Sequence, residues 1–559
     1  MPTEFDRQAY GEIYGPTTGD RVRLADSDLW IEIEDDATGY GDEALVGLGK
    51  TIRDGMLASA RIPADSELDL VITSVVVLDP VLGVLKTNIG VKDGRIAALG
   101  RAGNPDIVDD IDVLIGTATT LIAGEGLVAT PGAIDSHVHL MSPRVVPAAL
   151  AAGVTTIVGM GSGPVWDIGV NPGFTLRRME AAFASFPVNT VFLARGSSSR
   201  PEPMERALAA GAGGFKVHED TGAAPAAIDA ALEVAQAHDV AVAVHFDGLG
   251  ESGELQDFLE ATGGRTVHAY HVEGAGGGPV NLLEVVGVEH VLPSSTTPTI
   301  PYTVNALDEH PDMIVSAHAL HPGLPGDVEA ARLRVRGSTM AAEERLHDLG
   351  AISITNSDAL GMGRVDDTLR RTFQMASRMK GLLGAGTGVA DNERVLAYLA
   401  KFTINPSLAH GLAGLVGSLE VGKLADVVLW RPSFFAVKPE MVVKGGFVAW
   451  GAAGSGSASV ERAEPVTLGP LFGGFGATPS EISIRFVAET ALGDRARRWH
   501  GRPEAVGNTR DIQKRDMVGN DRLPSVHVDP STHLVTVDDT PITAEPARDV
   551  PLNRLYLLG

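Results

Sequence analysis

The chain has 559 residues, a formal net charge of −26 and no cysteine. This length exceeds what one hydrophobic core usually supports, so we expect two or more domains, one of them a large barrel. The acidic charge argues against nucleic acid or an anionic membrane surface as a partner. The absence of cysteine excludes disulfides, zinc–cysteine sites and cysteine nucleophiles, so any metal must be held by nitrogen and oxygen ligands.

No segment of the sequence is typical of export or of a membrane span. Met1 to Trp30 carries six acidic residues and lacks the apolar core of a signal peptide. The longest uncharged run, Val145 to Trp166, is interrupted by Gly, Pro and Thr, which favours a helix end, a turn and a strand. We therefore expect a soluble protein, and the lack of cysteine favours the cytoplasm.

Short alternating strands dominate two segments of the chain, residues 1–131 and 418–480, which lie on either side of the middle. Leu68 to Leu78 is an example in the first segment and Leu424 to Trp430 in the second. Because these segments flank a different middle, we expect one β-sandwich domain built from both sides of an inserted barrel. Residues 481–559 are expected to form a C-terminal extension.

The middle of the chain, residues 132–417, alternates candidate strands with helical stretches. The eight candidate strands are Ala133 to His139, Val154 to Met160, Asn189 to Ala194, Gly214 to Glu219, Ala241 to Asp247, Thr266 to Glu273, Val291 to Ser295 and Ala351 to Asp358. Eight strands separated by helices predict an α/β fold, a (β/α)8 TIM-like barrel, whose active site lies at the C-terminal strand ends.

Potential metal ligands gather at those strand ends. The first strand ends in His137-Val-His139, and because residues i and i+2 of a strand share a face, both imidazoles can reach one cation. The other candidates at strand ends are His218, His245, His271 and Asp358. A buried strand has no use for such residues unless they are paired, although His-x-His alone is equally consistent with an exposed strand end.

Lys216 lies in the apolar run Gly213-Gly-Phe-Lys-Val217. One interpretation is a lysine that extends to the barrel rim. The other is a buried neutral amine, which can take up carbon dioxide and form a carbamate with two oxygens that bridge two cations. With the histidines and Asp358 as further ligands, this second hypothesis predicts a two-metal hydrolase. Nitrogen and oxygen ligands suit nickel, zinc, iron or manganese.

Several longer motifs resemble the alpha (catalytic) subunit of bacterial ureases, which are nickel amidohydrolases, and the resemblance extends from about Tyr10 to the C-terminus. The motifs are Tyr14-Gly-Pro-Thr-Thr-Gly-Asp-Arg-Val-Arg-Leu24, Gly214-Phe-Lys-Val-His-Glu-Asp220, His271-Val-Glu-Gly-Ala-Gly-Gly-Gly278, Pro293-Ser-Ser-Thr296, Pro301-Tyr-Thr-Val304, Leu346-His-Asp-Leu-Gly350 and Gly422-Lys-Leu-Ala-Asp426. The chain is identified as a divergent member of this family. The resemblance implies hydrolysis of urea to ammonia and carbamate.

The resemblance also implies a role for each candidate residue. Two Ni²⁺ ions would share the carbamate of Lys216; one would be bound by His245 and His271, and the other by His137, His139 and Asp358. His218 would donate a hydrogen bond to the substrate carbonyl. His318 would be the general acid on a flap at about residues 308–347, tuned by Asp220 and Arg334. By contrast, His268 is expected to be a packed structural residue, because it lies three residues before His271 and points to the opposite face of the strand.

Partners are also implied by the resemblance. Urease beta and gamma subunits and nickel-delivery proteins would be separate chains, and the assembly would be a homo-oligomer of such heteromers.

The sequence departs from the urease pattern around the expected mouth of the site. In the flap, Val315-Ser-Ala-His-Ala-Leu-His-Pro322, Ala317 replaces a cysteine and Ala319 a histidine. The loop after the second strand is shorter, and Trp166 and Phe246 add bulk. Three hypotheses follow: a urease, a urease-like amidohydrolase for another amide, ureide or guanidine-type compound, and a non-catalytic scaffold. Retention of all the proposed ligands weighs against the scaffold.

Overall fold

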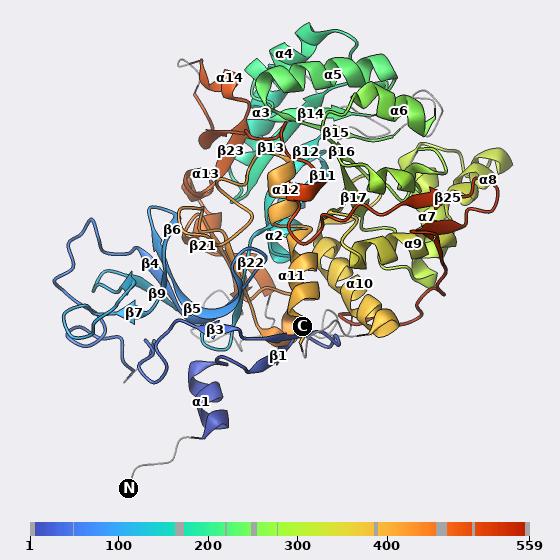
Figure 1. Ribbon diagram of the computed structural model, residues 1–559. Helices are drawn as coiled ribbons and strands as arrows, with labels where there is room; N and C mark the ends of the chain where they lie inside the picture. Colours follow the sequence, from blue (N-terminus) through green and yellow to red (C-terminus); the bar gives the residue numbers. More distant parts are fainter. Residues whose placement is uncertain are drawn as a thin grey trace.

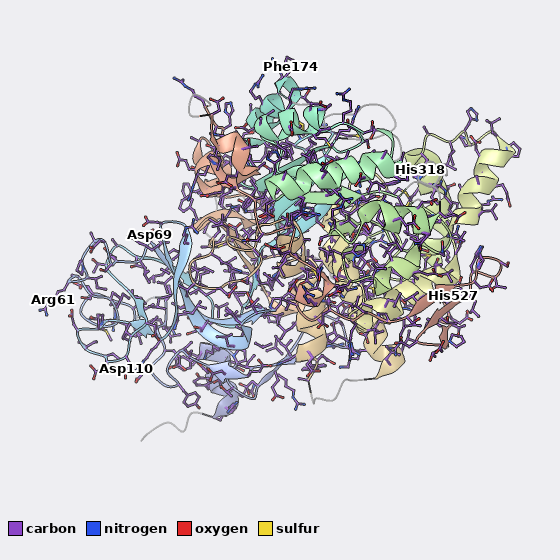
Figure 2. All side chains as sticks on the ribbon, turned by 45° about the horizontal axis from the view of Figure 1, so that its top comes forward. Arg61, Asp69, Asp110, Phe174, His318 and His527 are labelled. Atoms are coloured by element: carbon purple, nitrogen blue, oxygen red, sulfur yellow. The ribbon has the colours of Figure 1, made fainter. Side chains whose placement is uncertain are left out.

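The computed structural model consists of a β-rich domain and a larger α/β barrel (Figure 1). It describes residues 6–47, 50–161, 173–218, 221–246, 254–276, 278–384, 390–453, 467–494 and 498–553. Figure 2 shows Arg61 and Asp110 on the β-rich domain, far from His318 on the barrel. None of the helices in these described ranges is both long and apolar enough to cross a membrane.

The barrel is formed by parallel strands that follow one another in chain order from β11 to β18. They are β11 (Ala133–His139), β12 (Val154–Met160), β13 (Asn189–Arg195), β14 (Gly214–Val217), β15 (Ala241–Val244), β16 (Val267–Ala269), β17 (Val291–Thr296) and β18 (Ile354–Asn356). A parallel bridge between Val138 and Ala359 links the first strand to the segment after the last. The predicted (β/α)8 fold is therefore confirmed.

Four of the strands end earlier than predicted: β14 stops at Val217, and three others stop before a proposed ligand. β15, β16 and β18 stop before His245, His271 and Asp358, which lie in the turns that follow. His271 and Asp358 have φ angles of 36° and 54°, in the left-handed region that non-glycine residues seldom adopt. A hydrophobic pattern does not record such a turn, so the predicted strand ends were wrong. Backbone of this kind concentrates at functional sites.

Helices connect the strands around the outside of the barrel (Figure 1). They are α2 (Val145–Ala151), α3 (Phe174–Phe183), α4 (Pro201–Ala209), α5 (Pro225–His238), α6 (Leu255–Thr262) and the 3₁₀ turn η2 (Leu282–Gly287). Three helices separate β17 from β18: α7 (Val304–Ala317), α8 (Pro325–Arg334) and α9 (Gly337–Asp348). After β18 come α10 (Thr368–Leu383), α11 (Asn392–Ala400) and α12 (Ile404–Ala409). The predicted flap, at about residues 308–347, falls within the α7–α9 segment, and its role as a flap stays a prediction.

The β-rich domain is built from both flanks of the barrel, as predicted. Its central sheet contains β3 (Asp35–Asp36), β4 (Leu70–Asp79), β5 (Gly83–Lys92), β6 (Arg95–Gly100), β9 (Thr120–Ala123) and β10 (Val128–Pro131), followed by β19 (Val427–Trp430), β20 (Met441–Lys444), β21 (Phe447–Ala453) and β22 (Thr467–Pro470). The two flanks meet where β10 pairs antiparallel with β19. The domain limits at 131, 417 and 480 stay predictions.

The remaining elements lie at the two ends of the chain. The N-terminal ones are α1 (Arg7–Tyr14), β1 (Arg21–Arg23), β2 (Trp30–Glu32), β7 (Ala102–Gly103) and β8 (Val113–Leu114), and the C-terminal ones are α13 (Thr478–Ile482), β23 (Ile484–Val487), α14 (Glu489–Leu492), β24 (Arg502–Ala505), β25 (Val526–Val528), β26 (Val535–Val537) and β27 (Thr540–Ile542). β23 pairs with β13, so the predicted C-terminal extension adds to the barrel sheet.

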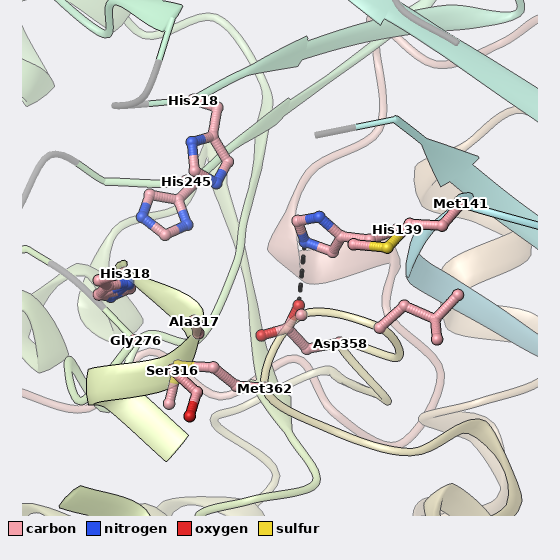
Figure 3. A pocket seen from close by; sticks show the side chains of 12 residues that line it. His139, Met141, His218, His245, Gly276, Ser316, Ala317, His318, Asp358 and Met362 are labelled. Carbon is pink, nitrogen blue, oxygen red and sulfur yellow. Dashed lines mark ion pairs between the residues drawn. The ribbon is translucent and has the colours of Figure 1, made fainter. Parts of the chain in front are cut away.

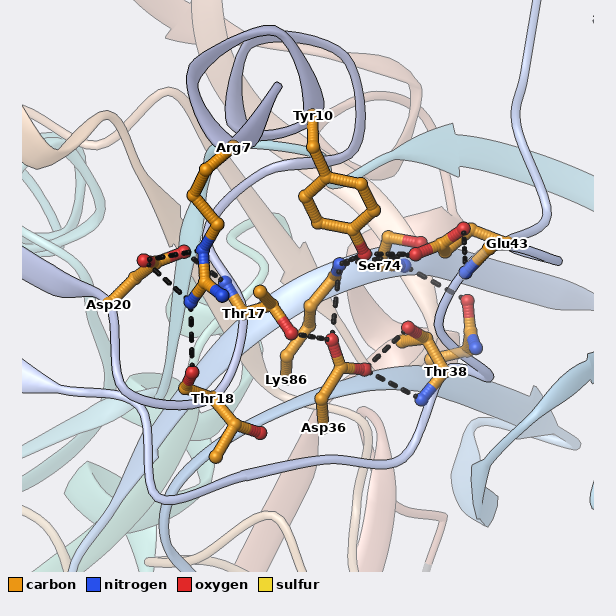
Figure 4. Close-up of polar contacts among 12 residues, drawn as sticks. Arg7, Tyr10, Thr17, Thr18, Asp20, Asp36, Thr38, Glu43, Ser74 and Lys86 are labelled. Carbon is orange, nitrogen blue, oxygen red and sulfur yellow. Dashed lines mark hydrogen bonds and ion pairs between the residues drawn. The ribbon is translucent and has the colours of Figure 1, made fainter. Parts of the chain in front are cut away.

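The N-terminal helix α1 contacts the β-rich domain through a buried polar cluster (Figure 4). Lys86 on β5 is fully buried, and its Nζ lies 3.1 Å from Tyr10 Oη and 3.4 Å from Asp36 Oδ2. Tyr10 donates its hydroxyl proton to Glu43. A buried ammonium is tolerated only when carboxylates and hydroxyls surround it, so this cluster holds α1 in one position.

A second buried ion pair joins the barrel to the β-rich domain. Asp426 Oδ1 lies 3.0 Å from Lys444 Nζ on β20, and Asp426 Oδ2 accepts a 2.8 Å hydrogen bond from Asn189 Nδ2 on β13. Burial lowers the pKa of Lys444, while Asp426 opposes that shift. Asp426 therefore fixes the barrel floor against the neighbouring sheet.

Asp426→Ala is expected to lower the free energy of unfolding by about 3–5 kcal/mol, because Lys444 would stay buried without its carboxylate. Denaturant unfolding of the two proteins measures the difference. In the double variant Asp426→Ala, Lys444→Met, most of the loss should be recovered, since no buried charge is left uncompensated. An Asp426→Ala protein as stable as the native chain would contradict this account.

Candidate metal centre

Three predicted ligands form a compact buried group at the C-terminal ends of the barrel strands. His137 and His139 come from β11 and Asp358 from the turn after β18, and their ligand atoms all lie within 4.8 Å of one another. Asp358 Oδ1 is 3.3 Å from His137 Nε2 and 3.1 Å from His139 Nε2, the latter contact drawn in Figure 3. Gly361 lets the turn approach this closely, because a Cβ there would lie 2.4 Å from Asp358 Oδ1.

The other three predicted ligands lie beside this group. His271 Nε2 is 2.8 Å from His245 Nδ1, and the ring centroids of His137 and His271 are 5.8 Å apart. Lys216, on β14, is only 2% exposed, and its Nζ lies 3.7 Å from the ring centroid of Tyr270. The fold thus brings all six predicted ligands together, and Lys216 is buried rather than extended to the barrel rim.

Burial sets the protonation of these groups. It lowers the pKa of His271 to about 3 and the pKa values of His137 and His245 well below the usual range, with neighbouring histidines and Lys216 adding to the effect on His137 and His245. Burial alone would raise the pKa of Asp358, but hydrogen bonding from His139 and nearby positive groups leave it below its ordinary value. Neutral imidazoles beside a carboxylate are the forms that bind metals.

A pocket of about 180 Å³ opens above this group (Figure 3). Its polar wall contains His139, His218, His245, His318 and Asp358. The His218 ring stacks on His245 with centroids 3.9 Å apart, and the His318 ring is 6.5 Å from His245 on the flap side. His318 directly follows α7, and its backbone N–H donates to Ile314 O. His218 and His318 both lie beside His245, across the pocket from His139 and Asp358, so both imidazoles can reach one small molecule bound there (Figure 3).

Comparison with known proteins identifies the family. The amidohydrolase family profile matches residues 128–459, and the profile of the urease alpha-subunit N-terminal domain matches residues 3–122. The chain is 55% identical to urease subunit alpha 1 of Streptomyces avermitilis over 98% of this chain and 99% of that relative. It is 54% identical to urease subunit alpha 2 of Streptomyces coelicolor over 99% of this chain and all of that relative. The chain belongs to the urease alpha-subunit family.

Among solved structures, a D-hydantoinase is similar with a TM-score of 0.47 and 16% identity, over 68% of this chain and 95% of the other. As a urease alpha-subunit family member, the chain is an amidohydrolase that acts on C–N bonds with a metal-dependent site.

The residues present fit such a metal. Within the described ranges, Nδ1 of His137 and Nδ1 of His271 are buried and have no hydrogen-bond partner, and Nε2 of His137 has only the 3.3 Å contact with Asp358 Oδ1. Buried polar atoms are nearly always partnered, and imidazole nitrogens next to a carboxylate are suitable ligands for a divalent cation. These imidazole nitrogens are therefore better explained as metal ligands than as members of a hydrogen-bonded structural cluster.

Asp220 and Arg334 are the two residues predicted to tune His318. Asp220 lies outside the described residues. Arg334 ends α8, and its charge acts on Arg336, whose pKa is lowered mainly by burial. An effect of either residue on His318 stays a prediction.

Several pocket residues were not found by sequence reasoning. They are Met141, Ser316 and Met362. Proximity in sequence to His139 and Asp358 was the available signal for the two methionines. The wall also contains Gly276, Leu360, Gly361 and Ala317, which the sequence had already placed near the mouth of the site. Trp166 and nearly all of its loop lie outside the described residues. The structure does not support added bulk from Phe246, which is buried against Phe258 of α6 with ring centroids 4.3 Å apart.

Proposed function

We propose that this chain is the catalytic subunit of a urease and hydrolyses urea to ammonia and carbamate. The observation that carries the proposal is the near-full-length identity of 55% to a urease alpha subunit. A pocket that joins the buried ligand group to two further histidines supports it.

The proposed cofactors are two Ni²⁺ ions. His137, His139 and Asp358 would hold one, and His245 and His271 the other. Lys216 would bridge them after its Nζ adds to carbon dioxide and releases a proton, which leaves an anionic carbamate. When bound, the metal pair would polarise the urea carbonyl and supply a hydroxide nucleophile near neutral pH.

The chain's own residues bind and protonate the substrate. His218 donates an N–H to the carbonyl oxygen of urea, and its stacking on His245 holds the imidazole in place. His318 gives a proton to the leaving nitrogen, which departs as ammonia while the water-derived oxygen stays on carbon. Closure of the α7–α9 flap excludes water from the pocket and brings His318 to the nitrogen.

We also propose that the chain assembles with urease beta and gamma subunits as a homo-oligomer of heteromers, and that nickel-delivery proteins load it in the cytoplasm. The name of its relatives as subunits supports an assembly of several chains. Co-expression with the candidate small subunits followed by size-exclusion chromatography tests this: a complex is expected, and elution of the chain by itself would contradict it.

Urea is expected to bind this enzyme more weakly than it binds ordinary ureases. Ala317, Met141 and Met362 in the pocket wall offer few hydrogen bonds to urea. The loss of one hydrogen bond, ~0.5–1.5 kcal/mol, corresponds to a KM about twofold to tenfold higher. A urea saturation curve on the nickel-loaded assembly measures KM, and Ala317→Cys should lower it.

A KM equal to that of an ordinary urease would show that the flap substitutions have no effect on binding. Two bound metal ions without urea turnover would instead favour another amide, ureide or guanidine-type compound as substrate, and the same protein should then be assayed on those.

A further inference from the structure

Tyr270 occupies a fully buried position directly beneath the candidate metal centre. It follows β16 and precedes His271, and 0% of its side chain surface is exposed. Because the backbone at His271 adopts the left-handed region, consecutive side chains can both face the site. His271 Nε2 contacts His245 Nδ1, whereas the ring of Tyr270 contacts ligands from two other strands.

The ring of Tyr270 contacts two of the proposed ligands. The imidazole of His137 stacks on it, with centroids 3.7 Å apart and planes inclined by 17°. Lys216 Nζ lies 3.7 Å from the same centroid. His137 comes from β11 and Lys216 from β14, so one aromatic ring is in contact with ligands from separate strands.

The ring itself is held in place from below and from the side. Its hydroxyl donates a 2.5 Å hydrogen bond to the carbonyl oxygen of Ser136, the residue before His137. His268 packs edge-on against it, with centroids 4.7 Å apart, and His268 Nδ1 lies 2.9 Å from His410 Nε2. His268 is thus a packed residue, as expected, and its ring contacts are with Tyr270 and His410.

We infer that Tyr270 is a positioning residue that sets the separation of Lys216 and His137 for metal binding; this rests on the proposed function. Lysine has a long stem with many rotamers, and a ligand gains affinity when its rotamer is restricted before binding. The face of Tyr270 limits where Lys216 Nζ can lie and fixes the plane of the His137 imidazole. Residues that orient ligands in this way contribute strongly to metal affinity.

Three substitutions distinguish the effect of the Tyr270 ring on metal binding from the effect of its hydroxyl and from a general loss of stability. Tyr270→Phe keeps the ring and removes the bond to Ser136, whereas Tyr270→Leu removes the ring. Tyr398→Leu is the matched control, because Tyr398 on α11 is also a buried tyrosine, 1% exposed, that bonds Asp348 outside the pocket wall. Each protein is stripped of metal and reloaded with Ni²⁺ and ¹³C-labelled bicarbonate.

The readouts are the nickel dissociation constant by chelator competition, the ¹³C carbamate resonance, and the thermal unfolding of the metal-free protein. We expect Tyr270→Phe to behave like the native chain. Tyr270→Leu should bind nickel roughly tenfold to a hundredfold more weakly and lose the carbamate resonance at nickel concentrations that saturate the native chain. Tyr398→Leu should lower only the unfolding temperature. If Tyr270→Leu does not fold, Tyr270→Met is measured in the same way.

Native nickel affinity and a native carbamate resonance in Tyr270→Leu or Tyr270→Met would overturn the inference. Equal loss of nickel affinity in Tyr398→Leu would overturn it too, because the effect would then be general destabilisation. Failure of the proposed function looks different: the native chain itself would bind no pair of nickel ions or show no urea turnover.

Discussion

Lys216→Ala is expected to lose metal and activity together. Without the bridge, five side chains would hold the two cations in a buried pocket that lacks the carbamate anion between them. Repulsion between the two cations would then expel at least one of them. Urea turnover should fall by about three orders of magnitude or more, since a metal pair supplies several kcal/mol of transition-state stabilisation. Elemental analysis of purified protein and a urea assay measure the two effects.

Lys401→Ala provides the control for this experiment. Lys401 is another fully buried lysine, and its Nζ donates to Ile352 O, away from the pocket wall. Its loss should reduce stability and leave two metals per folded chain. A small carboxylic acid added to Lys216→Ala should restore part of the metal content and activity, because its two oxygens can replace those of the carbamate. Full metal occupancy with normal turnover in Lys216→Ala would refute the bridged two-metal centre.

His318→Ala should keep its metals and lose roughly two to four orders of magnitude in kcat, the usual contribution of a general acid. The imidazole lines the pocket from the flap side and is not among the proposed ligands, so its removal leaves the metal donors intact. The measurements are metal content, kcat and the dependence of kcat on pH. The limb of the pH profile that reports the acid should disappear in the variant.

His321→Ala is the matched control for the flap. His321 is an exposed histidine three residues further along, and its Nδ1 accepts a 3.0 Å hydrogen bond from the backbone of Gly323. His321 lies outside the pocket wall, so the kcat of the His321→Ala variant should stay within about twofold of the native value. An unchanged kcat in His318→Ala would assign the proton donation to another group, and loss of metal in that variant would place His318 among the ligands.

The sequence by itself predicted the chemistry of the site because that chemistry depends on residue types at strand ends. His137 and His139 share a face by the two-residue period of a strand, and Lys216 is conspicuous in an apolar run. The alternation of strands and helices predicted the barrel, and the β pattern on both flanks predicted one additional domain, as the pairing of β10 with β19 confirms. Local periodicity carries this information.

Only the tertiary structure decided which long-range contacts complete the site. The left-handed turns at His271 and Asp358, the packing of Phe246 away from the pocket, and the contact of Tyr270 with Lys216 and His137 leave no periodic signal. Such contacts join residues far apart in the chain, and many partners are compatible with any one side chain. Their geometry follows from how the strands close and pack, which is a property of the whole barrel.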